Sequence, residues 1–132
     1  MNIAIGTANF YQKYGISKSL ISNKKKLKEI FQIIKKNKIR YLDTAFDYSS
    51  INKLKEYQKL DKLKIITKIK LPGKNNLSFI NNLDKKIKSE LIRANIKSFD
   101  SILLHNIDDL KSLYADQFIS KIKLLKKKKL KN

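Results

Sequence analysis

The chain has 132 residues, the size of one ordinary domain, and 42% of them are hydrophobic, so it can bury a core. It contains no cysteine, which excludes disulfides and thiolate metal sites and is compatible with a reducing compartment. The start, MNIAIGTANF, lacks the features of a signal peptide, and no run reaches the ~18 apolar residues that a membrane helix needs. We therefore expect a cytoplasmic protein without a membrane partner.

The formal net charge of +20 would suit a nucleic acid or an anionic membrane as a partner. However, only Arg40 and Arg93 are arginines, and proteins that read bases favour arginine for its bidentate fork. The lysines are also spread over every polar segment rather than gathered in one. We therefore expect no specific nucleic-acid partner.

The first part of the chain changes from a strand pattern to a helix pattern. The apolar run IAIG at residues 3–6 predicts a short strand that a glycine closes. Between Leu27 and Ile34, apolar residues recur three and four positions apart, which predicts a helix with Ser22 or Asn23 as its N-cap.

The same alternation continues along the rest of the chain. Further strands are predicted at residues 39–45, 63–71 and 99–105, and further helices at 50–59, 77–94 and 113–125. Strand and helix thus alternate four times, and the strands are continuous apolar runs. This pattern predicts an α/β fold whose parallel strands are covered by helices, with no linker that would divide it.

Ionisable residues stand at or near the ends of three predicted strands. Asp43 ends the second strand, Lys68 lies in the third, and His105 ends the fourth. Tyr48 follows the second strand by one short loop. Because the carboxyl ends of parallel strands lie on one side of such a fold, we expect these four side chains to converge.

Each of the four residues also has a simpler interpretation. Asp43 would cap the next helix, Tyr48 would pack at the rim, Lys68 would be one of many exposed lysines, and His105 would be a strand-end histidine with satisfied hydrogen bonds. Four such coincidences at one end of one sheet are less plausible than a single site. We therefore interpret the four residues as a catalytic group.

Together, these side chains would polarise a carbonyl group and protonate its oxygen. A phenol with an unperturbed pKa near ~10 is a poor proton donor at neutral pH, and a nearby ammonium is expected to lower that pKa. The carboxylate of Asp43 would keep Lys68 charged, and a neutral imidazole at His105 would orient the carbonyl. Because no protein side chain supplies hydride, a nicotinamide cofactor is implied.

Four segments, IGTANFYQKYGIS, YLDTAFDY, IITKIKLP and DSILLHN, occur in this order along the chain. In sequence and order they resemble the aldo-keto reductases, NAD(P)H-dependent oxidoreductases built on a (β/α)8 TIM barrel. The resemblance implies reduction of a small-molecule carbonyl substrate, with Tyr48 as the proton donor. It implies that Asp43, Lys68 and His105 are the other catalytic residues, and no metal site is predicted.

The resemblance also implies where NADPH, or NADH, would bind. Gly6, Thr7 and Ala8 would lie under the nicotinamide, and Asp43 would touch its ribose. The family usually has a glycine and then a glutamate after the catalytic tyrosine, whereas this chain has SSIN at residues 49–52. We therefore expect a substrate-side loop of different shape.

The resemblance covers four of the eight βα units, and a full barrel needs about 250 residues. The ending ISKIKLLKKKKLKN is similar to the helix that precedes the family's fifth strand. We therefore expect residues 1–132 to be the N-terminal half of such a barrel, truncated before the fifth strand, with an incomplete cofactor site. Self-association or a separate C-terminal half would close the barrel, and whether this half alone is active stays open.

Two other functions stay open at this point. A basic, non-enzymatic binding protein would use the lysine-rich surface, and its affinity for nucleic acid would fall steeply with salt. A barrel lyase or isomerase would use Lys68 as a Schiff-base amine. Neither accounts for all four residues as well as the reductase interpretation does.

Overall fold

The computed structural model describes residues 3–16, 23–48, 51–54, 56, 60–71, 77–111 and 113–129. Its centre is one sheet of four parallel strands in the order β1-β2-β3-β4. The strands are β1 (Ala4–Gly6), β2 (Tyr41–Asp43), β3 (Lys64–Ile69) and β4 (Ser101–Leu104). Each lies within its predicted range, so the sequence prediction of an α/β fold with parallel strands is confirmed.

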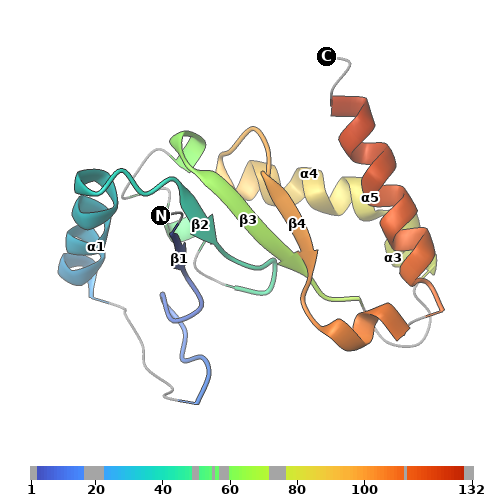
Figure 1. Cartoon of the computed structure of the whole chain (residues 1–132), viewed down its shortest axis with the longest axis horizontal. Coiled ribbons are helices and arrows are strands. Elements are labelled where there is room, and N and C mark those ends of the chain that lie inside the picture. The colour runs from blue at the N-terminus through green and yellow to red at the C-terminus, as the bar shows by residue number, and fades with distance from the viewer. Residues whose placement is uncertain are drawn as a thin grey trace.

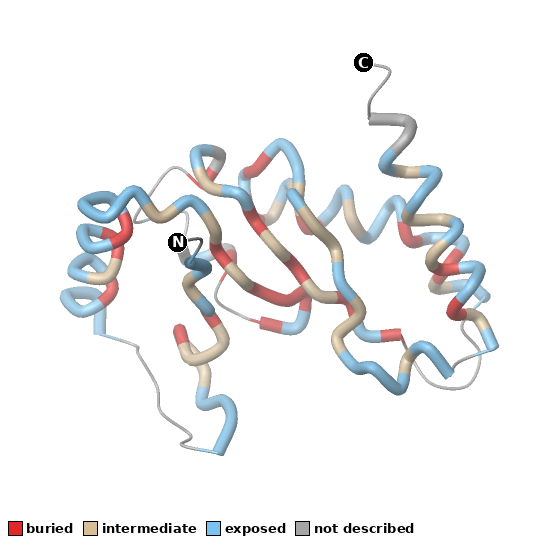
Figure 2. The backbone as a smooth tube through the Cα atoms, viewed as in Figure 1, coloured by how far each residue is buried: buried red, intermediate tan, exposed pale blue. Residues whose placement is uncertain are grey.

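Helices pack on one face of this sheet. α1 (Lys24–Lys36) lies on the β1 side, and α4 (Leu83–Ala94) and α5 (Ala115–Lys129) lie toward the β4 side (Figure 1). Buried positions alternate with more open ones along β3 (Figure 2), and Ile65 and Ile69 are among the buried ones. Because successive strand residues point to opposite faces, one face of the sheet meets the helices and the other is more open.

The start of α1 follows directly from its sequence. The side chain of Asn23 accepts a hydrogen bond from the main-chain N–H of Lys25 at 2.8 Å, so Asn23 is the N-cap. Ser22, the alternative cap, lies outside the described residues. The buried residues Leu27, Phe31 and Ile34 are spaced four and three positions apart, as one helix face requires.

The single helix predicted over 77–94 is divided in two. α3 (Leu77–Asn81) ends at Asn81, and α4 begins at Leu83, with Asn82 between them as its N-cap. The Asn82 side chain donates to the main-chain carbonyl of Ser78 at 2.9 Å. An asparagine amide that bonds the backbone in this way competes with the regular helix, which explains the break. α4 ends at Ala94, and its C-cap Asn95 has a left-handed conformation (φ 54°), which commonly terminates helices.

The remaining helices are shorter or later than predicted. The weak helix expected at 50–59 is represented by α2 (Ile51–Leu54), and residues 55 and 57–59 lie outside the described part. Short 3-10 helices follow at Leu60–Lys62 and Ile107–Lys111. α5 begins at residue 115 rather than 113, because Leu113 lies in a turn and is 93% exposed.

Two hydrophobic clusters hold the helices against the sheet. The first joins Leu27 and Phe31 of α1 to Leu42 of β2 and Ile65 of β3. The second lies between the sheet, α4 and α5, and its buried members are Phe46, Ile69, Leu71, Ile80, Leu83 and Phe118. Burial of each large apolar side chain stabilises the fold by about 1.5–3 kcal/mol. The second cluster anchors Phe46, which lies in the loop after β2.

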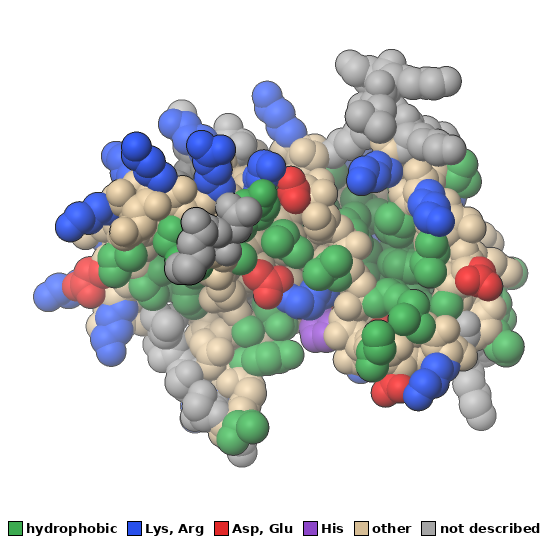
Figure 3. All heavy atoms as spheres, in the orientation of Figure 1, with side chains coloured by type: hydrophobic (Ala, Val, Ile, Leu, Met, Phe, Trp, Pro, Cys, Tyr) green, Lys and Arg blue, Asp and Glu red, His purple; other side chains and the backbone are tan. Residues whose placement is uncertain are grey.

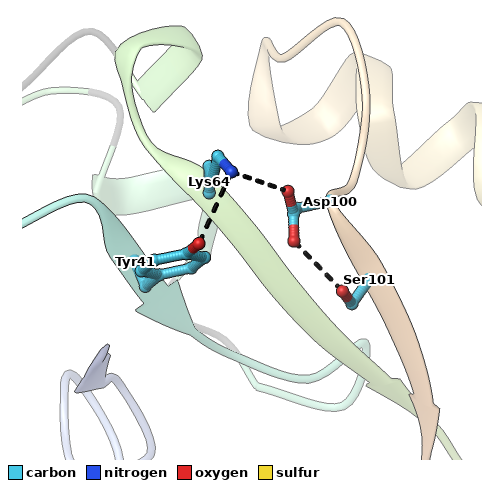
Figure 4. A network of polar contacts seen from close by, with 4 residues as sticks. All are labelled: Tyr41, Lys64, Asp100 and Ser101. Carbon is cyan, nitrogen blue, oxygen red and sulfur yellow. Dashed lines mark hydrogen bonds and ion pairs between the residues drawn. The ribbon is translucent and has the colours of Figure 1, made fainter. Parts of the chain in front are cut away.

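A polar network joins the amino-terminal ends of three strands (Figure 4). The Lys64 ammonium lies 3.4 Å from the Tyr41 hydroxyl and 3.8 Å from the Asp100 carboxylate. The Ser101 hydroxyl donates to Asp100 at 3.1 Å. Since the Lys64 side chain is 54% exposed, we expect these contacts to contribute little to stability. They mark the end of the sheet opposite to the candidate site.

Both edges of the sheet are open within the described residues, because β1 and β4 each pair on one side only. On the face shown in Figure 3, hydrophobic side chains lie between β4 and α5, and Leu103 on β4 is 47% exposed. Basic side chains lie over both α1 and α5 in this view, with acidic ones among them. No helix in the described part of the chain is long and apolar enough to cross a membrane.

Candidate active site

Asp43 and Lys68 form the centre of the candidate site. Asp43 ends β2 and pairs in register with Gly6 on β1 and Ile66 on β3, so Lys68, two residues further along β3, points to the same face. The Lys68 ammonium donates hydrogen bonds to the Asp43 carboxylate and, at 3.3 Å, to the main-chain carbonyl of Thr44. The two charged side chains are only 20% and 36% exposed, so the ion pair is partly shielded from water.

The phenol of Tyr48 lies against this ion pair and against His105. Tyr48 is only 5% exposed. The Lys68 ammonium is 5.9 Å from the centroid of its ring, and the His105 ring lies 6.1 Å away in an edge-on arrangement at 88°. The structure therefore brings the four residues together at one end of the sheet, while their catalytic roles stay predictions.

The pKa of the Tyr48 phenol is raised well above its ordinary value, whereas the sequence interpretation expected Lys68 to lower it. Burial is the largest cause, and a hydrogen bond with Tyr14 is the second. The negative charges of Asp43 and Asp47 add to the shift. The expected direction was wrong because Lys68 is already engaged by Asp43 and the phenol is shielded from water. The phenol is therefore fully protonated at neutral pH.

Tyr14 is a member of the site that the sequence analysis missed. It lies in the loop after β1, where the Asn9 side chain donates to its main-chain carbonyl at 3.1 Å. Its ring meets that of Tyr48 edge-on, with centroids 5.3 Å apart. Tyr14 is 41% exposed, so it connects the buried phenol to solvent. The sequence feature that could have pointed to Tyr14 is its position in the loop after a predicted strand, because such loops carry site residues in parallel α/β folds.

His105 directly follows β4 and completes the site. Its main-chain N–H donates to the carbonyl of Ile69 at 2.9 Å, which continues the pairing of β4 with β3. Its ring nitrogen Nδ1 is buried and has no hydrogen-bond partner among the described residues. Because buried polar atoms are usually paired, this nitrogen is an exception among the described residues, as are Thr44 Oγ1, Thr67 Oγ1 and Arg93 Nε.

The predicted cofactor residues lie beside Asp43. The Thr7 N–H donates to the Asp43 carbonyl at 2.9 Å, and Thr7 is fully buried. A Cβ added to Gly6 would meet nothing within 4 Å, so the space over this residue is open. Since Gly6 pairs with Asp43, a flat ring over Gly6 would lie next to the ion pair. This strand end therefore fits the nicotinamide end of the cofactor.

Nothing in the described ranges points to a metal centre. Within residues 3–16, 23–48, 51–54, 56, 60–71, 77–111 and 113–129, no group of three His, Asp or Glu side chains could hold a metal ion.

The fold is similar to that of a known enzyme. The chain matches no protein-family model and no curated protein sequence. Among solved structures, it is similar to an aldo-keto reductase of the silkworm Bombyx mori, with a TM-score of 0.60 and 18% sequence identity. The alignment covers 94% of this chain and 40% of the silkworm chain.

At this level of identity the similarity shows the fold alone. The silkworm enzyme is a (β/α)8 barrel, so the four parallel strands and their helices form part of such a barrel, as the sequence predicted. The chain spans about two fifths of the length of that enzyme.

Proposed function

We propose that this chain carries the proton-transfer half of an NAD(P)H-dependent aldo-keto reductase that acts on small-molecule carbonyl compounds. The observation that carries the proposal is the convergence of Asp43, Tyr48, Lys68 and His105 at the carboxyl end of one parallel sheet. These side chains come from three neighbouring strands and the loop after β2, and they leave an open surface over Gly6.

Each of the four residues would have a separate role in the protonation of a carbonyl oxygen. Tyr48 would donate the proton, although its raised pKa makes the phenol a weaker acid than a free tyrosine. His105 would hydrogen-bond the carbonyl oxygen and orient it, since its ring lies beside that of Tyr48. Lys68, held by Asp43, would stabilise the phenolate that Tyr48 becomes after it gives up the proton.

NADPH or NADH would supply the hydride for the carbonyl carbon when it is bound. Gly6, Thr7 and Ala8 would lie under the nicotinamide, and Asp43 would contact the ribose. The open space over Gly6 supports this placement, because a side chain there would occupy the position of the ring.

The structure favours this interpretation over the two alternatives. A Schiff base requires a neutral amine, whereas Lys68 is in an ion pair with Asp43. A non-enzymatic binding protein would use the exposed lysines and would give no reason for Tyr48 to be buried beside a charged pair.

We also propose that further parallel strands complete the barrel at the open edge of β4. The exposed Leu103 and the apolar surface between β4 and α5 support this (Figure 3). Further strands of a longer polypeptide, a separate C-terminal half or a second copy of this chain would each satisfy the unpaired edge. Residues 1–132 are then an N-terminal half barrel whose cofactor site is incomplete.

A comparison of NADPH binding by the unmodified protein and by the variant Gly6→Val tests the proposal. His105 is the single histidine of the chain, so its imidazole signals in NMR spectra report on this site without ambiguity. We expect NADPH to shift these signals with a dissociation constant in the millimolar range, because only part of the cofactor site is present. Gly6→Val should abolish the shift and keep the fold, since the new side chain enters open space.

The matched control is Ala4→Val, which adds the same side chain two residues earlier on the same face of β1. It should leave the shift unchanged. Saturation by NADPH in the Gly6→Val variant, or no shift in the unmodified protein, would contradict the proposal.

A further inference from the structure

An ion pair on α4, between the buried carboxylate of Glu90 and the partly exposed guanidinium of Arg93, contacts the loop that carries Tyr48. Arg93 and Glu90 lie one turn apart on α4, with Nη2 of Arg93 2.5 Å from Oε2 of Glu90. Glu90 is only 8% exposed. The same Nη2 donates a hydrogen bond to the main-chain carbonyl of Phe46, at 3.2 Å. The guanidinium group thus links a helix on the far side of the sheet to the loop after β2.

Phe46 is the residue through which the loop is fixed. Its N–H donates to the Lys68 carbonyl on β3 at 3.0 Å, and its ring is buried in the cluster with Ile69. The ring also lies 5.6 Å from that of Phe99. With the Arg93 bond to its carbonyl, Phe46 is held by its N–H, its carbonyl and its side chain.

Tyr48 follows Phe46 by two residues, and its orientation depends on this anchor. The Tyr48 N–H donates to the Ala45 carbonyl at 3.0 Å, which closes a tight turn around Phe46. The direction of the Tyr48 ring toward His105 is therefore set by the geometry of a turn whose centre Arg93 holds.

Burial of an unpaired carboxylate lowers the stability of a fold, because the charge loses its hydration. The buried Glu90 on α4 therefore needs a structural explanation. Burial raises the pKa of Glu90 despite the opposing charge of Arg93. A hydrophobic residue at this position would avoid the desolvation but would leave Arg93 without the carboxylate that holds its Nη2 beside the Phe46 carbonyl.

We propose that Arg93 and Glu90 are positioning residues for the proton donor: Arg93 fixes the Phe46 carbonyl, Glu90 orients Arg93, and the loop thereby presents the Tyr48 phenol to His105. This inference rests on the proposed function and extends it to two residues that do not touch the reacting atoms.

The test compares Arg93→Lys with Arg40→Lys, a change of the other arginine of the chain, which is exposed. Lysine keeps the charge and can pair with Glu90, but its side chain is one atom shorter, so its ammonium does not reach the position from which Nη2 contacts both Glu90 and the Phe46 carbonyl. The first readout is the nuclear Overhauser effect between the Tyr48 ring and the imidazole of His105, the single histidine. The second is hydrogen exchange at the Tyr48 amide, with the His105 amide as an internal reference.

In Arg93→Lys we expect the Tyr48–His105 effect to be lost. Exchange at the Tyr48 amide should become faster by about tenfold or more, while that at the His105 amide stays unchanged. Glu90→Gln should shift both readouts in the same direction, and Arg40→Lys should match the unmodified protein.

Three results would overturn the inference. One is an unchanged Tyr48–His105 effect in both Arg93→Lys and Glu90→Gln. Another is equal acceleration of both amides, which indicates a general loss of stability instead of a local change. The third is the absence of the effect in the unmodified protein, which would also contradict the proposed site. The first two leave the proposed function intact, so the two failures are distinguishable.

Discussion

The Lys68 ammonium on β3 donates a hydrogen bond to the Asp43 carboxylate at the end of β2, and this contact ties two neighbouring strands at the candidate site. The two partners differ in burial, because the Lys68 side chain is 20% exposed and that of Asp43 is 36% exposed. Removal of Asp43 and removal of Lys68 should therefore lower the free energy of unfolding by different amounts.

Asp43→Asn should destabilise the fold more than Lys68→Met does. The asparagine variant leaves a largely buried ammonium without its carboxylate, and we expect the free energy of unfolding to fall by about 1–3 kcal/mol. Lys68→Met leaves a carboxylate that water reaches more easily, and its effect should be about 0–1 kcal/mol. Urea unfolding measures both.

Asp100→Asn is the matched control, because it removes the carboxylate from the exposed Lys64 contact at the other end of the sheet. Its effect should stay within about 1 kcal/mol. If Asp43→Asn is as mild as this control, the ion pair at the candidate site is no better shielded than a surface contact.

Tyr14→Phe should lower the pKa of the Tyr48 phenol. The Tyr14 hydroxyl bonds to Tyr48 and raises that pKa, so its removal takes away one of the causes of the shift while burial stays. Alkaline titration followed by tyrosinate absorbance measures this, with the Tyr48 contribution taken from the difference between each protein and its Tyr48→Phe counterpart.

Tyr41→Phe serves as the control for the tyrosine titration, because Tyr41 lies at the opposite end of β2. It should leave the Tyr48 titration unchanged. An unaltered Tyr48 pKa in the Tyr14→Phe variant would argue that the two phenols do not interact in solution.

The buried carboxyl of Glu90 should make stability depend on pH in a defined direction. Its pKa in the fold is raised above the ordinary value of 4.5, mainly by burial and further by Asp47, against the opposing charges of Arg93 and Lys86. The folded state therefore binds the proton more tightly than the unfolded state, and ionisation of Glu90 lowers the free energy of unfolding as the pH rises from 4.5 upward.

Glu90→Gln removes this titration. The free energy of unfolding of the variant, relative to the unmodified protein, should therefore increase between pH 4.5 and pH 7. Denaturant unfolding at several pH values measures this difference. A difference that is constant with pH, or that decreases, would show that Glu90 does not carry a raised pKa.

The sheet could be predicted from the sequence because its strands are continuous apolar runs. IRYLDTA and FDSILLH contain β2 and β4 within their bounds, and parallel pairing followed from the helices between them. The convergence of Asp43, Lys68 and His105 is a consequence of this parallel order, since the ends of such strands lie together.

Other features depend on contacts that no local pattern encodes. The helix break at Asn82 comes from one side-chain hydrogen bond to Ser78, whereas the apolar spacing on either side continues without a gap. Arg93 was singled out in the sequence only as one of two arginines, and its bond to the Phe46 carbonyl spans 47 positions of the sequence. The direction of the Tyr48 pKa shift depends on burial, which the residue types alone do not set.

Transfer of deuteride from NADPH labelled at the nicotinamide C4 to an aldehyde tests the central claim most directly. Mass spectrometry of the alcohol detects one deuterium on the former carbonyl carbon. At NADPH concentrations in the millimolar range, which compensate for the incomplete cofactor site, we predict labelled alcohol from the unmodified protein. Tyr48→Phe should form it at least ~100-fold more slowly, because general acid catalysis is lost. No labelled alcohol from the unmodified protein, or an equal rate from Tyr48→Phe, would contradict the account.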